Sequence, residues 1–97
     1  MQTVRLAGKI TVERIGDAFR ALREAFEADP DVRVDASGVE EADSAFLQVL
    51  AACGRTAGAR GGSFRLTGVS GALARVAEAA GFSLEAWMGD AEEGGDG

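Results

Sequence analysis

The sequence contains no histidine and no tyrosine, and lysine occurs only once, at Lys9. Histidine is the commonest general acid–base and a frequent metal ligand, and tyrosine is a less common acid. Lysine forms Schiff bases and holds phosphates in phosphate-binding loops. Because most enzyme mechanisms lose their first candidates here, we expect a non-enzymatic protein with no catalytic residue, no metal site and no cofactor.

Cysteine is also scarce, since Cys53 is the only one. An internal disulfide is therefore impossible, and a reducing cytoplasm is the simplest location to expect. No apolar run approaches the roughly 20 residues needed to cross a bilayer, and no secretory signal is recognised, so we expect no membrane insertion. The formal net charge of −6 disfavours non-specific nucleic-acid binding, which depends on basic groups. The expected partner is a protein.

The composition that remains is that of an ordinary globular chain. The 97 residues are 46% hydrophobic and 27% charged, close to the averages for folded domains. This length accommodates one hydrophobic core, so we expect a single domain over residues 1–88. From residue 89 onward, glycines and acids without apolar anchors predict a disordered acidic tail over residues 89–97.

Three short segments alternate apolar and polar residues, which is typical of strands covered on one face only. They are Thr3–Leu6, Val32–Asp35 and Phe64–Thr67. The segment from Lys9 to Val12 is compatible with one more short strand. The uncovered face of the sheet is predicted to carry three arginines, Arg5, Arg33 and Arg65.

Apolar residues at three- and four-residue spacing predict a helix between the first two strands. The predicted buried set is Val12, Ile15, Ala18, Phe19, Leu22, Ala25 and Phe26. Thr11 is the expected N-cap, and Pro30 ends the helix because proline disfavours a helical residue before it.

Two further helices are expected after the second strand. One begins near Ser44 and ends in the glycines of residues 58–62, and the other begins at Ser70 and ends at Gly81. Their predicted buried residues are Leu47, Leu50, Ala51 and Cys53, then Leu73, Val76, Ala77 and Ala80. Residues 82–88 are expected to form a last short strand or turn, packed through Leu84 and Trp87. Alternating strands and helices with short connections predict an α/β fold, a mixed sheet with the helices packed on one face.

The segment after the second strand is the most informative part of the chain. It is predicted to form an acidic turn, containing Glu40, Glu41 and Asp43, followed by a helix that opens at Ser44. Unpaired N–H groups and the helix dipole favour an anion at such a position. Two interpretations of Ser44 remain open: a phosphate acceptor, or an N-cap whose oxygen accepts a backbone N–H.

Taken in order, these segments resemble the STAS domain, the family of bacterial anti-sigma factor antagonists that also includes sulfate-transporter tails and lipid-transport subunits. The resemblance runs from about Thr3 to Phe82. The segments that carry it are Val32–Asp35, Ser37-Gly38-Val39, Asp43-Ser44-Ala45, Leu47, Leu50, Gly61–Ser70, Leu73, Val76 and Gly81-Phe82. Phe46 is a departure, because the family usually has glycine there.

The resemblance implies a regulatory module in signal transduction and transcription. In antagonists of this family, the unmodified serine surface binds a kinase-like anti-sigma factor, and phosphorylation by that kinase releases it. By position, Ser44 matches the phosphorylated serine. The residues expected to bind the partner, within the surface of residues 39–53, are Glu40, Glu41, Asp43, Ser44, Ala45, Phe46 and Gln48.

An alternative function uses the same resemblance without phosphorylation. The motif Asp-Ser-Ala-x-Leu-Gln resembles that of STAS proteins from chemotaxis gene clusters. The alternative function is therefore a constitutive adaptor subunit of a chemotaxis-associated or ABC-transporter complex. Two interpretations of Phe46 are also open: an exposed aromatic anchor for the partner, or a side chain packed beneath Val39 or the first strand.

Overall fold

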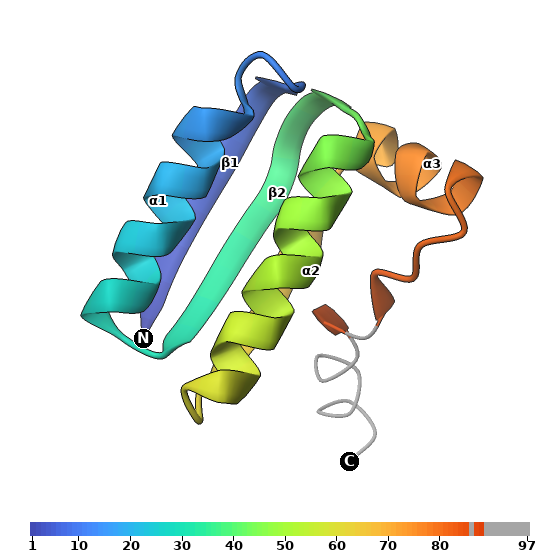
Figure 1. Cartoon of the computed structure of the whole chain (residues 1–97). Coiled ribbons are helices and arrows are strands. Elements are labelled where there is room, and N and C mark those ends of the chain that lie inside the picture. The colour runs from blue at the N-terminus through green and yellow to red at the C-terminus, as the bar shows by residue number, and fades with distance from the viewer. Residues whose placement is uncertain (86, 89–97) are drawn as a thin grey trace.

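The computed structural model describes residues 1–85, 87 and 88, and Figure 1 shows strands and helices that alternate along the chain. The elements are β1 (Gln2–Ile10), α1 (Ile15–Ala28), β2 (Asp31–Ala42), α2 (Ser44–Ala59), β3 (Ser63–Val69) and α3 (Gly71–Ala79). The predicted α/β alternation is confirmed. The acidic tail expected at residues 89–97 lies outside the described residues.

The sheet has the strand order β1-β2-β3, and both pairings are parallel. A mixed sheet was expected, but the strands of the described residues all run in one direction. β2 is the central strand. β3 pairs only with its first half, Asp31–Ala36, whereas β1 follows it to its end at Ala42.

β1 and β2 are longer than the alternation pattern predicts. The segment at Lys9 is no separate strand, because β1 continues to Ile10 through register shifts between Arg5 and Ala7 and between Gly8 and Lys9. Gly8 has a φ of 81°, which glycine adopts without strain. Residues 39–42, expected in a turn, extend β2, and Val39, Glu41 and Ala42 pair with β1. The bulges interrupt the two-residue period, which is why sequence pattern missed the extension.

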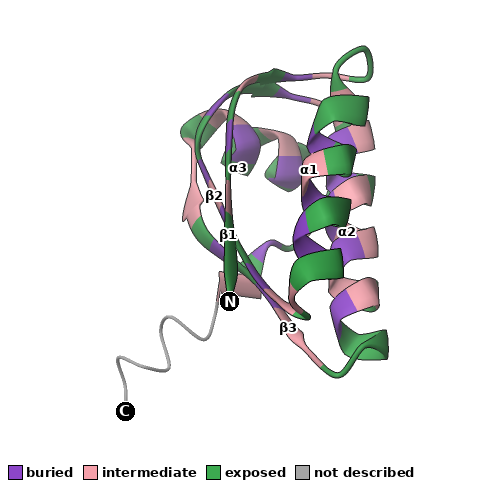
Figure 2. Ribbon diagram, turned by 90° about the vertical axis from the view of Figure 1, so that its left-hand side faces the viewer, coloured by how far each residue is buried: buried purple, intermediate pink, exposed green. Residues whose placement is uncertain are grey.

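The helices α1 and α2 lie side by side on one face of the sheet, as Figure 2 shows. Alternate residues of β2 point into this layer, so that Val32, Val34 and Ala36 are buried. α3 packs against β2 and lies beside its last residues, Glu40–Ala42, beyond the part that pairs with β3. On the opposite face, the three predicted arginines of the sheet are exposed: Arg5, Arg33 and Arg65.

The start of α1 differs from the prediction. Thr11 does not cap the helix; its carbonyl accepts the N–H of Arg14 at 2.8 Å in a preceding turn, and α1 begins at Ile15. Val12 belongs to that turn and is 64% exposed instead of buried. Phe19, at the edge of the apolar stripe, is 48% exposed, because α1 turns Ala18 and Leu22 toward the sheet.

The ends of α2 and α3 follow the expected local chemistry. Gly61 and Gly81, just after these helices, have φ of 73° and 69°. The Ser70 hydroxyl caps α3 by accepting the N–H of Leu73 at 3.1 Å. Ala80, expected on the buried face, is the exposed C-cap residue.

The segment after α3 packs through the two residues expected there. Residues 85, 87 and 88 are helical, so the described part of this segment forms no strand. Leu84 is buried, and the ring of Trp87 meets that of Phe64 edge to face, with centroids 5.5 Å apart. The segment therefore closes the core beside β3.

Candidate functional site

Asp43 organises the start of α2. Its backbone is extended, and its Oδ1 accepts the N–H of Ala45 at 3.1 Å. Its Oδ2 accepts the N–H of Val12 at 2.9 Å, from the turn between β1 and α1. The N-cap is therefore Asp43, and the interpretation of Ser44 as the cap is wrong.

Ser44 is the first residue of α2 and is exposed to solvent. Gln48, one turn later, is also exposed, and residues four apart lie on the same side of a helix. Ala45, between them in sequence, is half-buried. Because the positive end of the helix dipole lies at this turn, the Ser44 hydroxyl is accessible at a position that favours an anion.

The acidic residues Glu40 and Glu41 are exposed at the end of β2. With Ala42 they line a shallow depression of about 290 Å³, whose other wall includes Arg75 and Val76 of α3. Carboxyl ends of parallel strands and the starts of the following helices meet at one edge of a sheet. The structure thus brings the predicted residues of β2 and the exposed start of α2 to the same end of the molecule.

Phe46 does not belong to the exposed surface. Its side chain is 0% exposed and lies in the core with Leu47 and Leu50. Phe46 and Leu50 are four positions apart in sequence, so both point to the same, buried side of α2. Phe46 is therefore not exposed to bind a partner directly, and its ring packs in the core.

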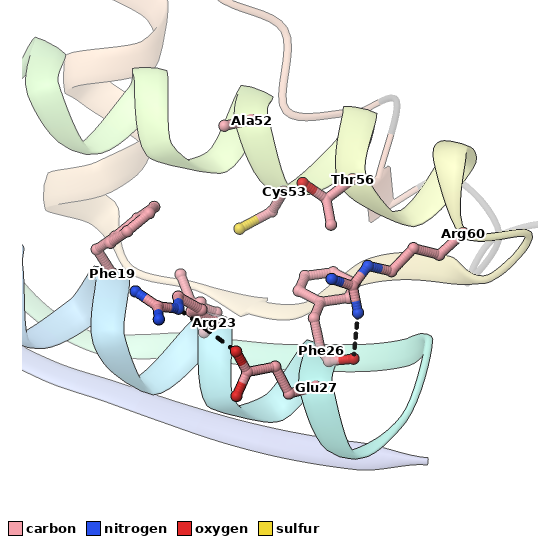
Figure 3. A pocket seen from close by; sticks show the side chains of 9 residues that line it. Phe19, Arg23, Phe26, Glu27, Ala52, Cys53, Thr56 and Arg60 are labelled. Carbon is pink, nitrogen blue, oxygen red and sulfur yellow. Dashed lines mark hydrogen bonds and ion pairs between the residues drawn. The ribbon is translucent and has the colours of Figure 1, made fainter.

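Sequence reasoning missed a groove between α1 and α2, shown in Figure 3. Its volume is about 260 Å³, and its apolar lining includes Phe19, Leu22, Phe26, Ala52 and Cys53. The sequence signal for this groove was the width of the apolar stripe on α1, which includes Phe19 and is broader than packing against the sheet requires.

Polar side chains line the rim of the groove. The Arg23 Nε lies 3.5 Å from Glu27 Oε2, and the Arg60 Nη1 donates to the carbonyl of Phe26 at 3.1 Å. Arg60 follows α2, so this second bond joins the C-terminal ends of the two helices. Thr56 also lines the groove.

Cys53 faces this groove but is poorly suited to act as a nucleophile. Its side chain is 7% exposed, and burial raises the pKa of its thiol to about 11. The thiolate is the reactive form, so this thiol is largely unreactive near neutral pH.

A metal centre and a membrane-spanning helix are both absent from the described part of the chain. Residues 1–85, 87 and 88 contain no group of three or more His, Cys, Asp or Glu side chains placed to hold a metal ion. Within the same residues, every helix is too short or too polar to span a bilayer.

Comparison with curated proteins gave no match. Comparison with protein families gave a match of residues 1–84 to the family described as "Mlab, STAS domain". This match covers the whole α/β core and the exposed start of α2. The chain therefore belongs to the STAS domain family, whose members are regulatory and protein-interaction modules.

Proposed function

We propose that this chain is a non-catalytic module of the anti-sigma factor antagonist type, which binds a partner protein and is switched by phosphorylation of Ser44. The binding surface comprises the end of β2 and the exposed side of α2, within residues 39–53. The observation that carries the proposal is the exposed hydroxyl of Ser44 at the first residue of a long helix, in a STAS domain.

The switch needs no change of fold. A phosphate on Ser44 brings roughly −1.5 to −2 charges and three acceptor oxygens to the surface. Asp43, Glu40 and Glu41 already make this end of the molecule acidic. After phosphorylation, a partner that binds the unmodified surface would have to place its own groups beside this concentrated negative charge, or remove water from it.

The size of the effect follows from Coulomb's law. With an effective dielectric near 20, two unit charges about 6 Å apart interact by roughly 3 kcal/mol before salt screening. Since about 1.4 kcal/mol corresponds to a tenfold change in affinity, a phosphate that faces a like charge of the partner weakens binding on the order of a hundredfold.

The test measures affinity for the partner recovered from the source cell. We expect Ser44→Asp to weaken binding at least tenfold and Ser44→Ala to bind like the parent. Ser83→Asp is the matched control, because Ser83 is exposed but follows α3. The intact mass of the protein recovered from cells reports the phosphate. Equal affinities of Ser44→Asp and the parent would show that charge at Ser44 is not the control.

A second candidate is a constitutive subunit of a chemotaxis-associated or ABC-transporter complex, with no phosphorylation. The exposed apolar side chains of Val12, in the turn before α1, and Phe19, within α1, favour it, because permanent interfaces bury apolar surface. Co-purification of a stable complex that phosphatase treatment leaves unchanged, with Ser44 unmodified, supports this candidate over the switch.

A further inference from the structure

The groove between α1 and α2 adjoins the proposed binding surface. Ser44, Gln48 and Ala52 follow one another at four-residue spacing along α2, and Ala52 lines the groove. At 1.5 Å rise per residue, Ala52 lies about 12 Å along the helix from Ser44. A partner that covers the start of α2 can therefore reach the groove with one short helix.

The groove is apolar at a place where solvent reaches it. Phe19 is a large aromatic residue, 48% exposed, at one end of the groove, and Arg60 stands at the other end in Figure 3. Exposed aromatic rings beside a concave apolar surface are typical of docking sites. The volume of about 260 Å³ holds one large apolar side chain with room around it.

The rim is more basic than the rest of this acidic chain. Arg23 and Arg60 flank the groove, and Glu27 is the only acid among its lining residues. Glu27 pairs with Arg23, and Arg60 uses one nitrogen on the carbonyl of Phe26. A guanidinium group has five N–H donors, so Arg60 retains donors for an incoming carboxylate.

The occupant that fits this chemistry is helical. The groove is walled by side chains of two helices, and the carbonyl of Phe26 is already bonded, so an extended strand finds no backbone edge to pair with. An amphipathic helix instead presents apolar side chains at three- and four-residue spacing to such a groove.

We propose that the groove between α1 and α2 receives an amphipathic helix of the partner protein. One large apolar side chain of that helix lies against Phe19 and Phe26, and a carboxylate follows it toward Arg60. This inference rests on the proposed function, because it identifies the part of the partner that binds beside the Ser44 surface.

The groove is tested with the full chain in its source cell. Ala52→Arg fills the groove, and Ala59→Arg is the matched control, since Ala59 is an exposed alanine of α2 that does not line it. We expect Ala52→Arg to lower recovery of the partner at least tenfold and Ala59→Arg to leave recovery unchanged. Thermal unfolding of each variant checks the fold. Phe19→Ser, which removes a half-exposed ring, gives the same answer without filling the groove.

The occupant is identified with a photo-reactive residue. Phe19→p-benzoylphenylalanine is expected to cross-link to a partner segment that has apolar residues at three- and four-residue spacing and an acid beside them. A cross-link to a second copy of this chain, or a small amphiphile found in the groove by native mass spectrometry without any cross-linked peptide, overturns the inference.

The failures of the two proposals are distinguishable. If Ala52→Arg and Phe19→Ser bind the partner like the parent while Ser44→Asp loses it, the groove is not used and the switch stands. If the groove variants lose the partner and Ser44→Asp keeps it, the helix-binding groove stands and the switch does not.

Discussion

At the start of α2, one carboxylate serves two backbone segments. Asp43 accepts the N–H of Ala45, its own helix, and the N–H of Val12, which is distant in sequence. The acid that precedes Ser44 thus has a structural task in this chain. Ser44 is left without that task, and its hydroxyl is exposed.

This division of labour predicts different costs at the two positions. Asp43→Ala removes a helix cap and a long-range hydrogen bond, and is expected to cost about 2 kcal/mol of unfolding free energy. Ser44→Ala is expected to stay within about 0.5 kcal/mol of the parent. Urea unfolding measures both. Equal stabilities of the two variants would contradict the assignment of Asp43 as the cap.

Asp35 shows the clearest local electrostatics on the open face of the sheet. The Ser37 hydroxyl donates to Asp35 Oδ1 at 2.6 Å and the Ser37 N–H at 3.0 Å, and these bonds hold the pKa of the carboxyl below its ordinary 3.8. The Arg5 Nε lies 3.9 Å from Asp35 Oδ2, and its positive charge lowers the pKa of Asp35 further, by a smaller amount.

The pH dependence follows from the sign of this shift. Because the pKa of Asp35 is lower in the folded chain, its contribution to stability is complete above the unfolded pKa and is lost as the pH falls through the folded one. Ser37→Ala is expected to raise the pKa of Asp35 toward 3.8, and Arg5→Gln to raise it less. Carboxyl-carbon NMR titration measures both. A larger rise in Arg5→Gln would reverse the assigned order of causes.

Among the elements, α2 meets the C-terminal segment at a glycine. A Cβ built on Gly54 would lie 2.7 Å from the Trp87 Nε1, whereas one on Gly58 would meet nothing within 4 Å. Glycine at position 54 therefore makes room for the indole, and glycine at 58 has no such role.

Two glycine-to-alanine variants of α2 distinguish the effect of steric room for Trp87 from the effect of helix propensity. Gly58→Ala is expected to stabilise the protein by roughly 0.5–1 kcal/mol, because alanine loses less entropy in a helix. Gly54→Ala is expected to displace Trp87 and destabilise the protein. Trp87 is the only tryptophan in the sequence, so its fluorescence maximum reports the displacement. An unchanged spectrum in Gly54→Ala would show that the indole does not depend on this glycine.

The elements also show which features were predictable from sequence. Most ends set by local chemistry were correct, namely Pro30 after α1, the Ser70 cap, and the glycines at 61 and 81, whereas the Thr11 cap was not. Features that depend on partners distant in sequence were missed. The extension of β2 over residues 37–42 needs β1 beside it, and the Asp43 cap shares its carboxylate with Val12.

The candidate site was predictable to the same extent. The exposed position of Ser44 at the start of a helix followed from sequence pattern, and the structure has it there. Phe46 was named among the partner-binding residues, with packing left open as the other interpretation, although its four-residue spacing to Leu50 places it on the buried side of α2. The groove requires the relative placement of α1 and α2, which no local pattern contains.

On the scale of the whole molecule, the parallel sheet makes the fold depend on its last third. β2 needs a neighbour on each side, and β3 supplies Phe64 and Leu66 to the core, while α3 supplies Leu73. Parallel neighbours are joined by crossovers and not by tight hairpins, so no part of the sheet is a local unit.

We therefore expect a chain that ends at Arg60 to remain unfolded, although it contains β1, α1, β2 and α2. Circular dichroism and the dispersion of amide signals in NMR spectra measure this directly against the full chain. Cooperative thermal unfolding of the shortened chain would contradict the expectation, because it would show that β1 and β2 form a stable sheet without β3.

Hydrogen bonds connect the α1 and α2 regions near both ends of the two helices. Asp43 joins the beginning of α2 to the turn before α1, and Arg60 joins the region after α2 to the last turn of α1. Their separation is thus fixed before anything binds, and a site that is already shaped sacrifices little conformational freedom on association. Competing partners should then arrive at similar rates and differ mainly in the lifetimes of their complexes.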